Sequence, residues 1–394
     1  MIYDFDHVPD RIHTESVKWR TYDPDVLPMW VADMDFPSPQ PVVQALQERV
    51  AQGIYGYPKE LPDFREILVD RLAQRYHWQV QPDELIFLEG VVTGFNLACH
   101  TVAEPGAGVL VQNPIYFPML KAPANAHMQR QDMELTRLSD GSYAIDWEAF
   151  ENAIDDRTRL FMLCNPHNPV GRVFREEELE RMAEICLQHD ITICSDEIHC
   201  DLVYSGQKHI PIASIDSEIA RHTITLIAPS KTYNIAGLQC SVAIIQDPDL
   251  REAYQLARQG LVSWVNLMGM VAGRAAYAEG QEWLDQLLPY LESNRDHLYT
   301  FVEQNLPGIS MAKPEGTYLA WLDCREAGIP GNPQEFFLKE GRVAFNDGKT
   351  FGQGGEGFVR LNFGCPRSML TEALQRMQVA LESHRQDTSG DLKE

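Results

Sequence analysis

Short apolar runs alternate with amphipathic stretches between about residue 80 and residue 245, and this alternation restricts the fold more than any other feature. A short apolar run suits a strand buried on both faces, and the amphipathic stretch after it suits a covering helix. The stretch 176–189, for example, puts Leu179, Met182 and Ala183 on one helical face. The pattern predicts an α/β domain with a doubly wound, mostly parallel sheet. The candidate strands are Leu85–Leu88, Val109–Val111, Leu160–Leu163, Ile191–Cys194, Thr223–Ile227 and Val242–Ile245.

The two ends of the chain have a different pattern. Ser38, followed by Pro39 and Pro41, predicts the start of a helix that stops near Gly53. Helices and strands mix in the C-terminal part, which predicts a small α+β domain built from both chain ends. Its expected elements are a long helix from about Trp283, a strand at Thr317–Leu322, a helix near Pro333–Glu340, a strand at Phe358–Asn362 and a helix at about Met369–Glu382.

These patterns divide the chain into four parts. Residues 1–47 are expected to form an N-terminal arm and part of the small domain, and 48–284 the large α/β domain. Residues 285–383 complete the small domain. The polar tail 384–394 is expected to be disordered.

Charge and cysteine usage exclude several functional classes. The formal net charge of -24 argues against binding nucleic acid or an anionic membrane surface. No apolar run approaches the ~20 residues that span a bilayer, and the acidic start has no signal-peptide pattern, so a cytoplasmic location is expected. The eight cysteines form no C-x-x-C pair, which predicts reduced, buried thiols and no metal site.

Distinctive segments follow several predicted strands, at the sheet edge where α/β proteins bind ligands. Glu89–Gly94 has small residues at a strand-to-helix turn, whose N–H groups can bind a phosphate. In Asn113–Phe117 an aromatic ring could stack on a planar cofactor. In Asn165–Gly171 two Asn-Pro pairs keep the chain extended, so that an Asn can donate to a ligand. A structural turn, a core aromatic ring and a rigid loop are the respective alternatives.

Two charged segments, Ser195–His199 and Pro229–Asn234, follow the next apolar runs. An Asp that leaves a buried strand needs a cationic partner, because an unpaired buried carboxylate is costly. Lys231 lies beside Ser230 at a strand end, where burial could deprotonate its amine. These segments are compatible with a ligand site and also with a structural ion pair between Asp196 and Lys231.

Together these segments resemble the fold-type I pyridoxal-phosphate (PLP) enzymes of the aminotransferase class I/II group. The resemblance covers essentially the whole chain and implies PLP as the cofactor. It rests on the order and intervals of Gly90-Val91-Val92, Tyr116, Asn168, Asp196, Lys231 and Arg360.

The resemblance implies a role for each residue. Lys231 would carry PLP as a Schiff base and act as general base, and Asp196 would keep the pyridine nitrogen protonated. Asn168 would bond the phenolic oxygen of the ring, and Tyr116 would stack on its face. Arg360 would bind the substrate carboxylate. The phosphate would be held by the N–H groups of Val91 and Val92, the Ser230 hydroxyl and Tyr55 of a neighbouring subunit, with Tyr57 as the fallback. The shared site implies a homodimer.

Two positions depart from the common aminotransferase pattern. Gln239 stands where many members have a phosphate-binding Arg, and His199 stands where many have a Tyr beside the cofactor. With Trp30–Phe36 and Gly364–Arg367, these departures resemble the branch of cystathionine β-lyases and related cysteine C–S lyases. That branch implies that Ala32 lies near the substrate carboxylate and that His199 belongs to the cofactor site. The Trp30–Phe36 run is also compatible with a buried amphipathic arm.

The branch implies a C–S β-lyase that cleaves cystathionine, or another cysteine thioether, to a thiol, pyruvate and ammonia. An aminotransferase that uses the same site is the alternative. A PLP-binding regulatory protein that acts through a protein partner is a second alternative. The expected ligands are PLP and a small amino acid, and the residues do not identify the leaving group.

Overall fold

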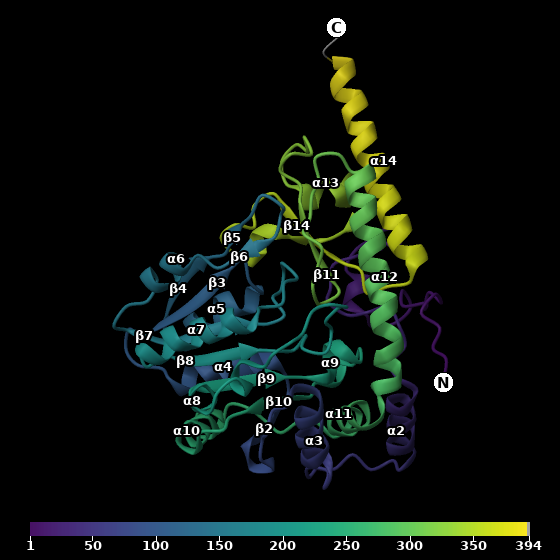
Figure 1. Cartoon of the computed structure of the whole chain (residues 1–394). Coiled ribbons are helices and arrows are strands. Elements are labelled where there is room, and N and C mark those ends of the chain that lie inside the picture. Colours follow the sequence, from purple (N-terminus) through teal and green to yellow (C-terminus); the bar gives the residue numbers. More distant parts are fainter. Residues whose placement is uncertain (392–394) are drawn as a thin grey trace.

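A seven-stranded sheet from the central part of the sequence forms the middle of the molecule (Figure 1). Its strands are β2 (Leu85–Leu88), β3 (Gly108–Asn113), β4 (Gln129–Glu134), β7 (Thr158–Cys164), β8 (Thr192–Asp196), β9 (Thr223–Ile227) and β10 (Ser241–Ile244). They lie in the order β2, β10, β9, β8, β7, β3, β4. β10 is antiparallel to both neighbours, and every other adjacent pair is parallel. The computed structural model describes residues 1–391, and it confirms the predicted doubly wound, mostly parallel sheet.

The six strands predicted for the large sheet are all present, with small differences at their ends. β8 ends at Asp196 instead of Cys194, so the Asp196 carboxylate belongs to the strand itself. β4 is an additional strand at the edge of the sheet, where it buries only Met133. Because its polar sequence contains no apolar run, β4 could not be predicted from hydrophobic pattern.

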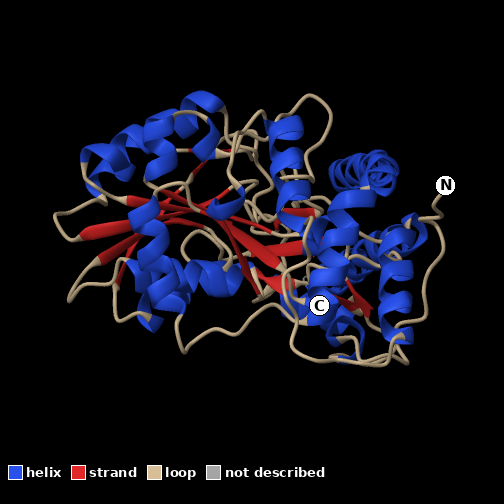
Figure 2. Cartoon of the chain, turned by 90° about the horizontal axis from the view of Figure 1, so that it is seen from below, coloured by secondary structure: helices blue, strands red, loops and turns tan. Residues whose placement is uncertain are grey.

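Helices cover both faces of the sheet (Figure 2). On one face lie α4 (Val91–Thr101), α5 (Phe117–Asn125) and α10 (Pro248–Arg258). On the other face lie α6 (Trp147–Asn152), α7 (Glu176–Gln188) and α8 (Ser217–Arg221). Successive strand residues alternate between the two cores: Leu160 belongs to the same core as Phe95 of α4, and Phe161 to the same core as Leu179 of α7. Apart from β4, the strands are mostly apolar because both of their faces are buried.

A third group of helices lies beside β2 and β10 at one end of the sheet. It consists of α2 (Gln40–Ala51), α3 (Phe64–Tyr76) and α11 (Leu267–Glu279). α2 is the helix predicted after Ser38; Pro39 is its N-cap, and it packs on α11. The short elements are α1 (Val17–Arg20), α9 (Pro229–Thr232), β5 (Thr136–Arg137), β6 (Tyr143–Ala144) and the 3₁₀ turns Pro82–Glu84, Ile212–Ser214, Ala236–Leu238 and Gly348–Phe351.

The predicted small α+β part forms from both ends of the chain. β1 (Leu27–Pro28) pairs in parallel with β12 (Val343–Ala344). A separate antiparallel sheet has the order β11 (Leu319–Asp323), β14 (Phe358–Asn362), β13 (Asn346–Asp347). The helices here are α12 (Gln281–Asn305), α13 (Pro333–Glu340) and α14 (Arg367–Asp391). α12 and α14 pack side by side as the two long helices of Figure 1.

The C-terminal tail differs from the prediction. Residues 384–394 were expected to be disordered, but α14 continues to Asp391, and residues 392–394 lie outside the described part of the chain. The continuation has tertiary support, since the His384 ring packs on Phe336 and Arg385 donates to the Pro307 carbonyl. The expected domain boundaries after residues 47 and 284 both fall inside helices, α2 and α12, so that division stays a prediction. Among the described residues, none of the helices is long and apolar enough to cross a membrane.

Candidate active site

A cavity of about 310 Å³ lies at the carboxyl edge of the large sheet, where the segments after β2, β3, β7, β8 and β9 converge. Because β10 is antiparallel, its start also lies at this edge and brings Gln239 and Cys240 to the cavity. Most of the predicted site residues come together here. Those that line the cavity are Ala32, Val91, Val92, Tyr116, Asn168, Asp196, His199, Ser230 and Lys231.

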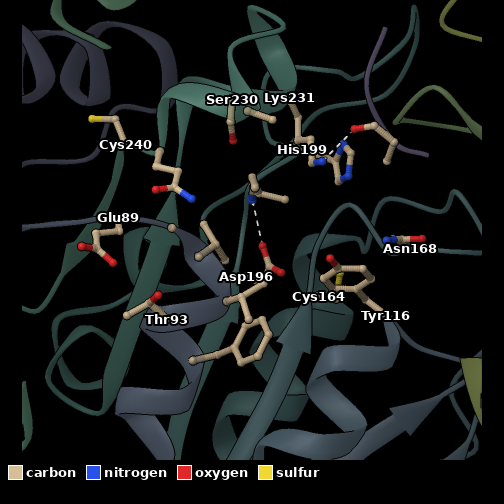
Figure 3. A pocket seen from close by; sticks show the side chains of 18 residues that line it. Glu89, Thr93, Tyr116, Cys164, Asn168, Asp196, His199, Ser230, Lys231 and Cys240 are labelled. Carbon is tan, nitrogen blue, oxygen red and sulfur yellow. Dashed lines mark hydrogen bonds between the residues drawn. The ribbon is translucent and has the colours of Figure 1, made fainter. Parts of the chain in front are cut away.

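One end of the cavity is formed by the N-terminus of α4. Its N-cap, Gly90, has no side chain to bond the first turn, and a Cβ at this position would meet no atom within 4 Å. Val91 and Val92 are the first two residues of α4, so their N–H groups have no intrahelical partner. Without a capping side chain on Gly90, these groups are available to an anion. The Ser230 side chain lines the same cavity from the start of α9 (Figure 3).

Asp196 and Lys231 face the cavity from neighbouring strand ends (Figure 3). The Asp196 carboxylate is 3% exposed and accepts one bond, from the Ile198 N–H at 3.1 Å. Burial raises the pKa of Asp196 to about 7, although the Lys231 charge acts in the opposite direction. Asp196 is therefore a buried acid poised for a cationic ligand.

The Lys231 amine donates to the carbonyl oxygen of Ala32 at 2.7 Å rather than to a carboxylate. This contact replaces the structural Asp196–Lys231 ion pair that the sequence left open. Burial lowers the pKa of Lys231 to about 8, and the Arg360 charge adds to the effect. A lysine with such a pKa has a substantial neutral fraction near pH 8, so it can act as a nucleophile and a base.

Tyr116, Asn168 and His199 form the other side of the cavity (Figure 3). The side-chain oxygen Oδ1 of Asn168 accepts from Arg360 Nη1 at 3.0 Å, which leaves the side-chain NH₂ group of Asn168 free to donate to a ligand. His199 is 2% exposed, and its Nδ1 has no partner among the described residues. Burial, with the charges of Lys231 and Arg360, moves the pKa of His199 well below its ordinary value. The imidazole is therefore neutral at physiological pH.

The Trp30–Phe36 segment is both a buried arm and a wall of the cavity. The Asn234 side chain bonds the backbone of Met34 and the carbonyl of Phe36. The Ala32 carbonyl accepts from Tyr318 as well as from Lys231. Met34, Asp35 and Phe36 of this run are buried, as suits the arm interpretation, and Ala32 lines the cavity. That Ala32 lies near the substrate carboxylate stays a prediction.

Two groups of predicted residues do not line the cavity. Arg360, on β14, contacts Asn168 on the side away from the cavity and is 3% exposed. Burial lowers the pKa of Arg360 to about 10. Tyr55 and Tyr57 lie on the surface, 61% and 97% exposed. Neither tyrosine contributes to the cavity of its own chain.

Some residues that line the cavity carried no signal in the sequence. Cys164 closes β7 beside Tyr116, and Cys240 precedes β10 (Figure 3). Burial raises the pKa of Cys164 well above its ordinary value, so the predicted inert thiol is consistent with its position. Among the residues that the structure describes, no group of His, Cys, Asp and Glu side chains could hold a metal ion.

Residues 24–377 match the family described as aminotransferase class I and II. The chain belongs to this family. Among its relatives, cystathionine beta-lyase PatB of Bacillus subtilis is 41% identical, over 96% of this chain and 100% of PatB. A PLP-bound putative aminotransferase from Clostridium difficile is 38% identical with a TM-score of 0.93, over 96% of this chain and 100% of that one. A PLP-bound C–S lyase from Staphylococcus hominis is 33% identical with a TM-score of 0.90, over 96% and 99%.

The family match extends over all the segments that form the cavity and is not limited to one motif. The match begins before the Trp30–Phe36 arm and ends beyond β14, so it includes both ends of the chain that enclose the cavity. The fold expected from the resemblance is therefore confirmed.

Proposed function

We propose that this protein is a PLP-dependent C–S β-lyase that cleaves cystathionine or another cysteine thioether to a thiol, pyruvate and ammonia. The observation that carries the proposal is the facing pair of a buried acid, Asp196, and a buried amine, Lys231, across one cavity. The similarity to PatB and to the Staphylococcus hominis C–S lyase supports the reaction class.

The residues present fit PLP. The open N-terminus of α4 and the Ser230 hydroxyl suit its phosphate, and the buried Asp196 carboxyl suits a protonated pyridine nitrogen. The free amide group of Asn168 suits the phenolic oxygen, and the partnerless Nδ1 of the neutral His199 gives the site one further polar atom. Tyr116 offers a ring to stack on the cofactor.

PLP, when bound, supplies an electron sink that stabilises negative charge at the substrate Cα. Lys231 takes the Cα proton, since the protein keeps part of its amine neutral, and it can return that proton later. Asp196 keeps the proton on the ring nitrogen. The buried surroundings exclude water from these charges and strengthen their interactions.

Arg360 binds the substrate carboxylate in this proposal. Arg360→Lys keeps the charge but loses the planar fork, so kcat/KM should fall roughly 10- to 150-fold, the value of one hydrogen bond to a charged group. The measurement compares S-methyl-L-cysteine with its decarboxylated amine. Equal losses for both substrates would mean that Arg360 only holds β14 in place.

We also propose that the protein works as a homodimer in the cytoplasm. The exposed apolar side chains Ile54, Tyr55, Tyr57, Leu261 and Trp264 give it a surface to bury against a second copy. All eight cysteines are free, as suits a reducing compartment.

Tyr55 is expected to reach the phosphate in the partner's cavity. Tyr55→Phe should then weaken PLP binding about 10- to 100-fold, the cost of one charge-assisted hydrogen bond, without dissociating the dimer. The measurement is equilibrium PLP binding together with sedimentation, and Tyr57→Phe is the matched control. Normal PLP binding by Tyr55→Phe with weakened binding by Tyr57→Phe would transfer the role to Tyr57, and an active monomer would contradict the shared site.

A direct assay separates lysis from transamination. Purified protein is incubated with cystathionine or S-methyl-L-cysteine, with and without an added 2-oxo acid, and pyruvate, thiol and amino-group transfer are measured separately. The lyase proposal expects pyruvate and thiol in equal amounts without the 2-oxo acid. Products that require the 2-oxo acid would instead identify an aminotransferase.

A further inference from the structure

The Arg360 guanidinium has an unusual set of partners for a buried cation. It donates to Asn168 Oδ1 at 3.0 Å, to the Trp30 carbonyl at 3.1 Å and to Asn346 Oδ1 at 2.6 Å. The centre of the Phe351 ring lies 5.0 Å from the Arg360 Cζ atom. Within the part of the chain that the structure describes, every one of these partners is uncharged.

Other largely buried arginines of this protein are paired with carboxylates. Arg71 contacts Asp201 at 2.8 Å, and Arg172 contacts Glu178 at 2.6 Å. Burying a cation without a counter-charge is costly, so the neutral surroundings of Arg360 need a reason. Neutral acceptors orient the guanidinium without neutralising it, which keeps its charge available to an incoming anion.

Asn346 makes the shortest of the three contacts, and the strand register explains its position. Asn346 lies directly opposite Arg360 in the β13–β14 pair, and the next residue, Asp347, lies opposite Val359. Because side chains alternate along a strand, the Asp347 carboxylate points to the other face. There it accepts from the Asn332 side chain at 2.8 Å and from the Lys349 N–H at 3.0 Å.

We propose that Asn346 is a specificity-determining positioning residue, which holds Arg360 in place while leaving its full charge for the substrate carboxylate. A guanidinium only donates hydrogen bonds, so the amide oxygen of Asn346 faces it. A carboxylate at this position would have the same shape but would compete with the substrate. The inference rests on the proposed function, in which Arg360 binds that carboxylate.

Asn346→Asp tests the charge with almost no change of shape. The dissociation constants of L-alanine and of ethylamine are measured for the PLP-loaded protein from the absorbance of the bound cofactor. The dissociation constant of L-alanine should rise about 10- to 100-fold, because the carboxylate of L-alanine loses a charged partner. The dissociation constant of ethylamine, which has no carboxylate, should stay the same. The Tm of the cofactor-free protein should rise, because the buried cation gains a counter-charge.

Two further variants separate charge from structure. Asn346→Ala removes the orienting contact but adds no charge, so its L-alanine affinity should fall less than that of Asn346→Asp. Asp347→Asn, on the other face of the strand, should leave L-alanine affinity unchanged. If Asn346→Asp weakens both ligands equally or neither, or if Asn346→Ala is the worse variant, the inference is overturned.

Arg360→Lys distinguishes this inference from the proposed function. If Arg360→Lys weakens L-alanine but Asn346→Asp does not, only the role of Asn346 is wrong. If L-alanine affinity is insensitive to Arg360→Lys, the proposed role of Arg360 fails, and the inference about Asn346 fails with it.

Discussion

Lys231→Ala is expected to lower turnover of a cysteine thioether by about 10⁴-fold or more, because one side chain supplies both the nucleophile and the base. The Lys231 amine is the group that faces Asp196 in the cavity, and its pKa of about 8 suits proton transfer near neutral pH. Borohydride treatment of the PLP-loaded wild-type protein should join the cofactor to Lys231, as peptide mapping would show.

The matched control is Lys208→Ala, which removes an exposed lysine of the same chain. This variant should keep wild-type turnover and borohydride labelling. Labelling of any lysine other than Lys231, or turnover by Lys231→Ala close to that of the wild type, would contradict the assignment.

Asp196→Ala is expected to lower the rate of the chemical step by about three orders of magnitude, which corresponds to a barrier higher by ~4 kcal/mol. Without the carboxylate the ring nitrogen has no counter-charge in a buried site, so it loses its proton and the ring withdraws electrons poorly. Single-turnover kinetics at saturating PLP separate this effect from weaker cofactor binding.

Asp196→Asn provides a control of the same shape. The amide can keep the contact with the Ile198 N–H, but it carries no charge. If charge is what matters, Asp196→Asn should be nearly as impaired as Asp196→Ala. Near-wild-type turnover in Asp196→Asn would show that shape alone suffices and would refute the proposed electrostatic role.

The sheet was predictable because its strands are buried on both faces. An apolar run such as Thr223–Ile227 can satisfy that environment, and a helix with Leu179 and Met182 on one face can cover it. β4 could not be predicted for the opposite reason, since an edge strand can remain polar on most of its length. The extension of α14 depends on Phe336 and Pro307, which are distant in sequence and carry no local signal.

The candidate site was predictable where each residue directly follows a strand. Tyr116, Asn168, Asp196 and Lys231 share an edge of the sheet by topology alone. The contact of Arg360 with the Trp30 carbonyl could not be predicted, because 330 residues separate the two in the chain. The contact with Asn346, only 14 residues away, depends on strand pairing instead. A pairing register between two short strands decides which of Asn346 and Asp347 faces Arg360.

The pairing of β1 with β12 has a consequence for biosynthesis. Leu27 and Val343 are neighbours in space although most of the chain separates them. Until the C-terminal part has left the ribosome, the arm that places Ala32 against Lys231 lacks its partner strand, although the Asn234 side chain can already bond the backbone of Met34 and Phe36. The nascent large sheet can condense earlier from its local βα units, as domains generally do during translation. The wall is therefore fully anchored late, and a translation product that stops before β12 would have its Lys231 but an Ala32 wall without the β1–β12 pairing.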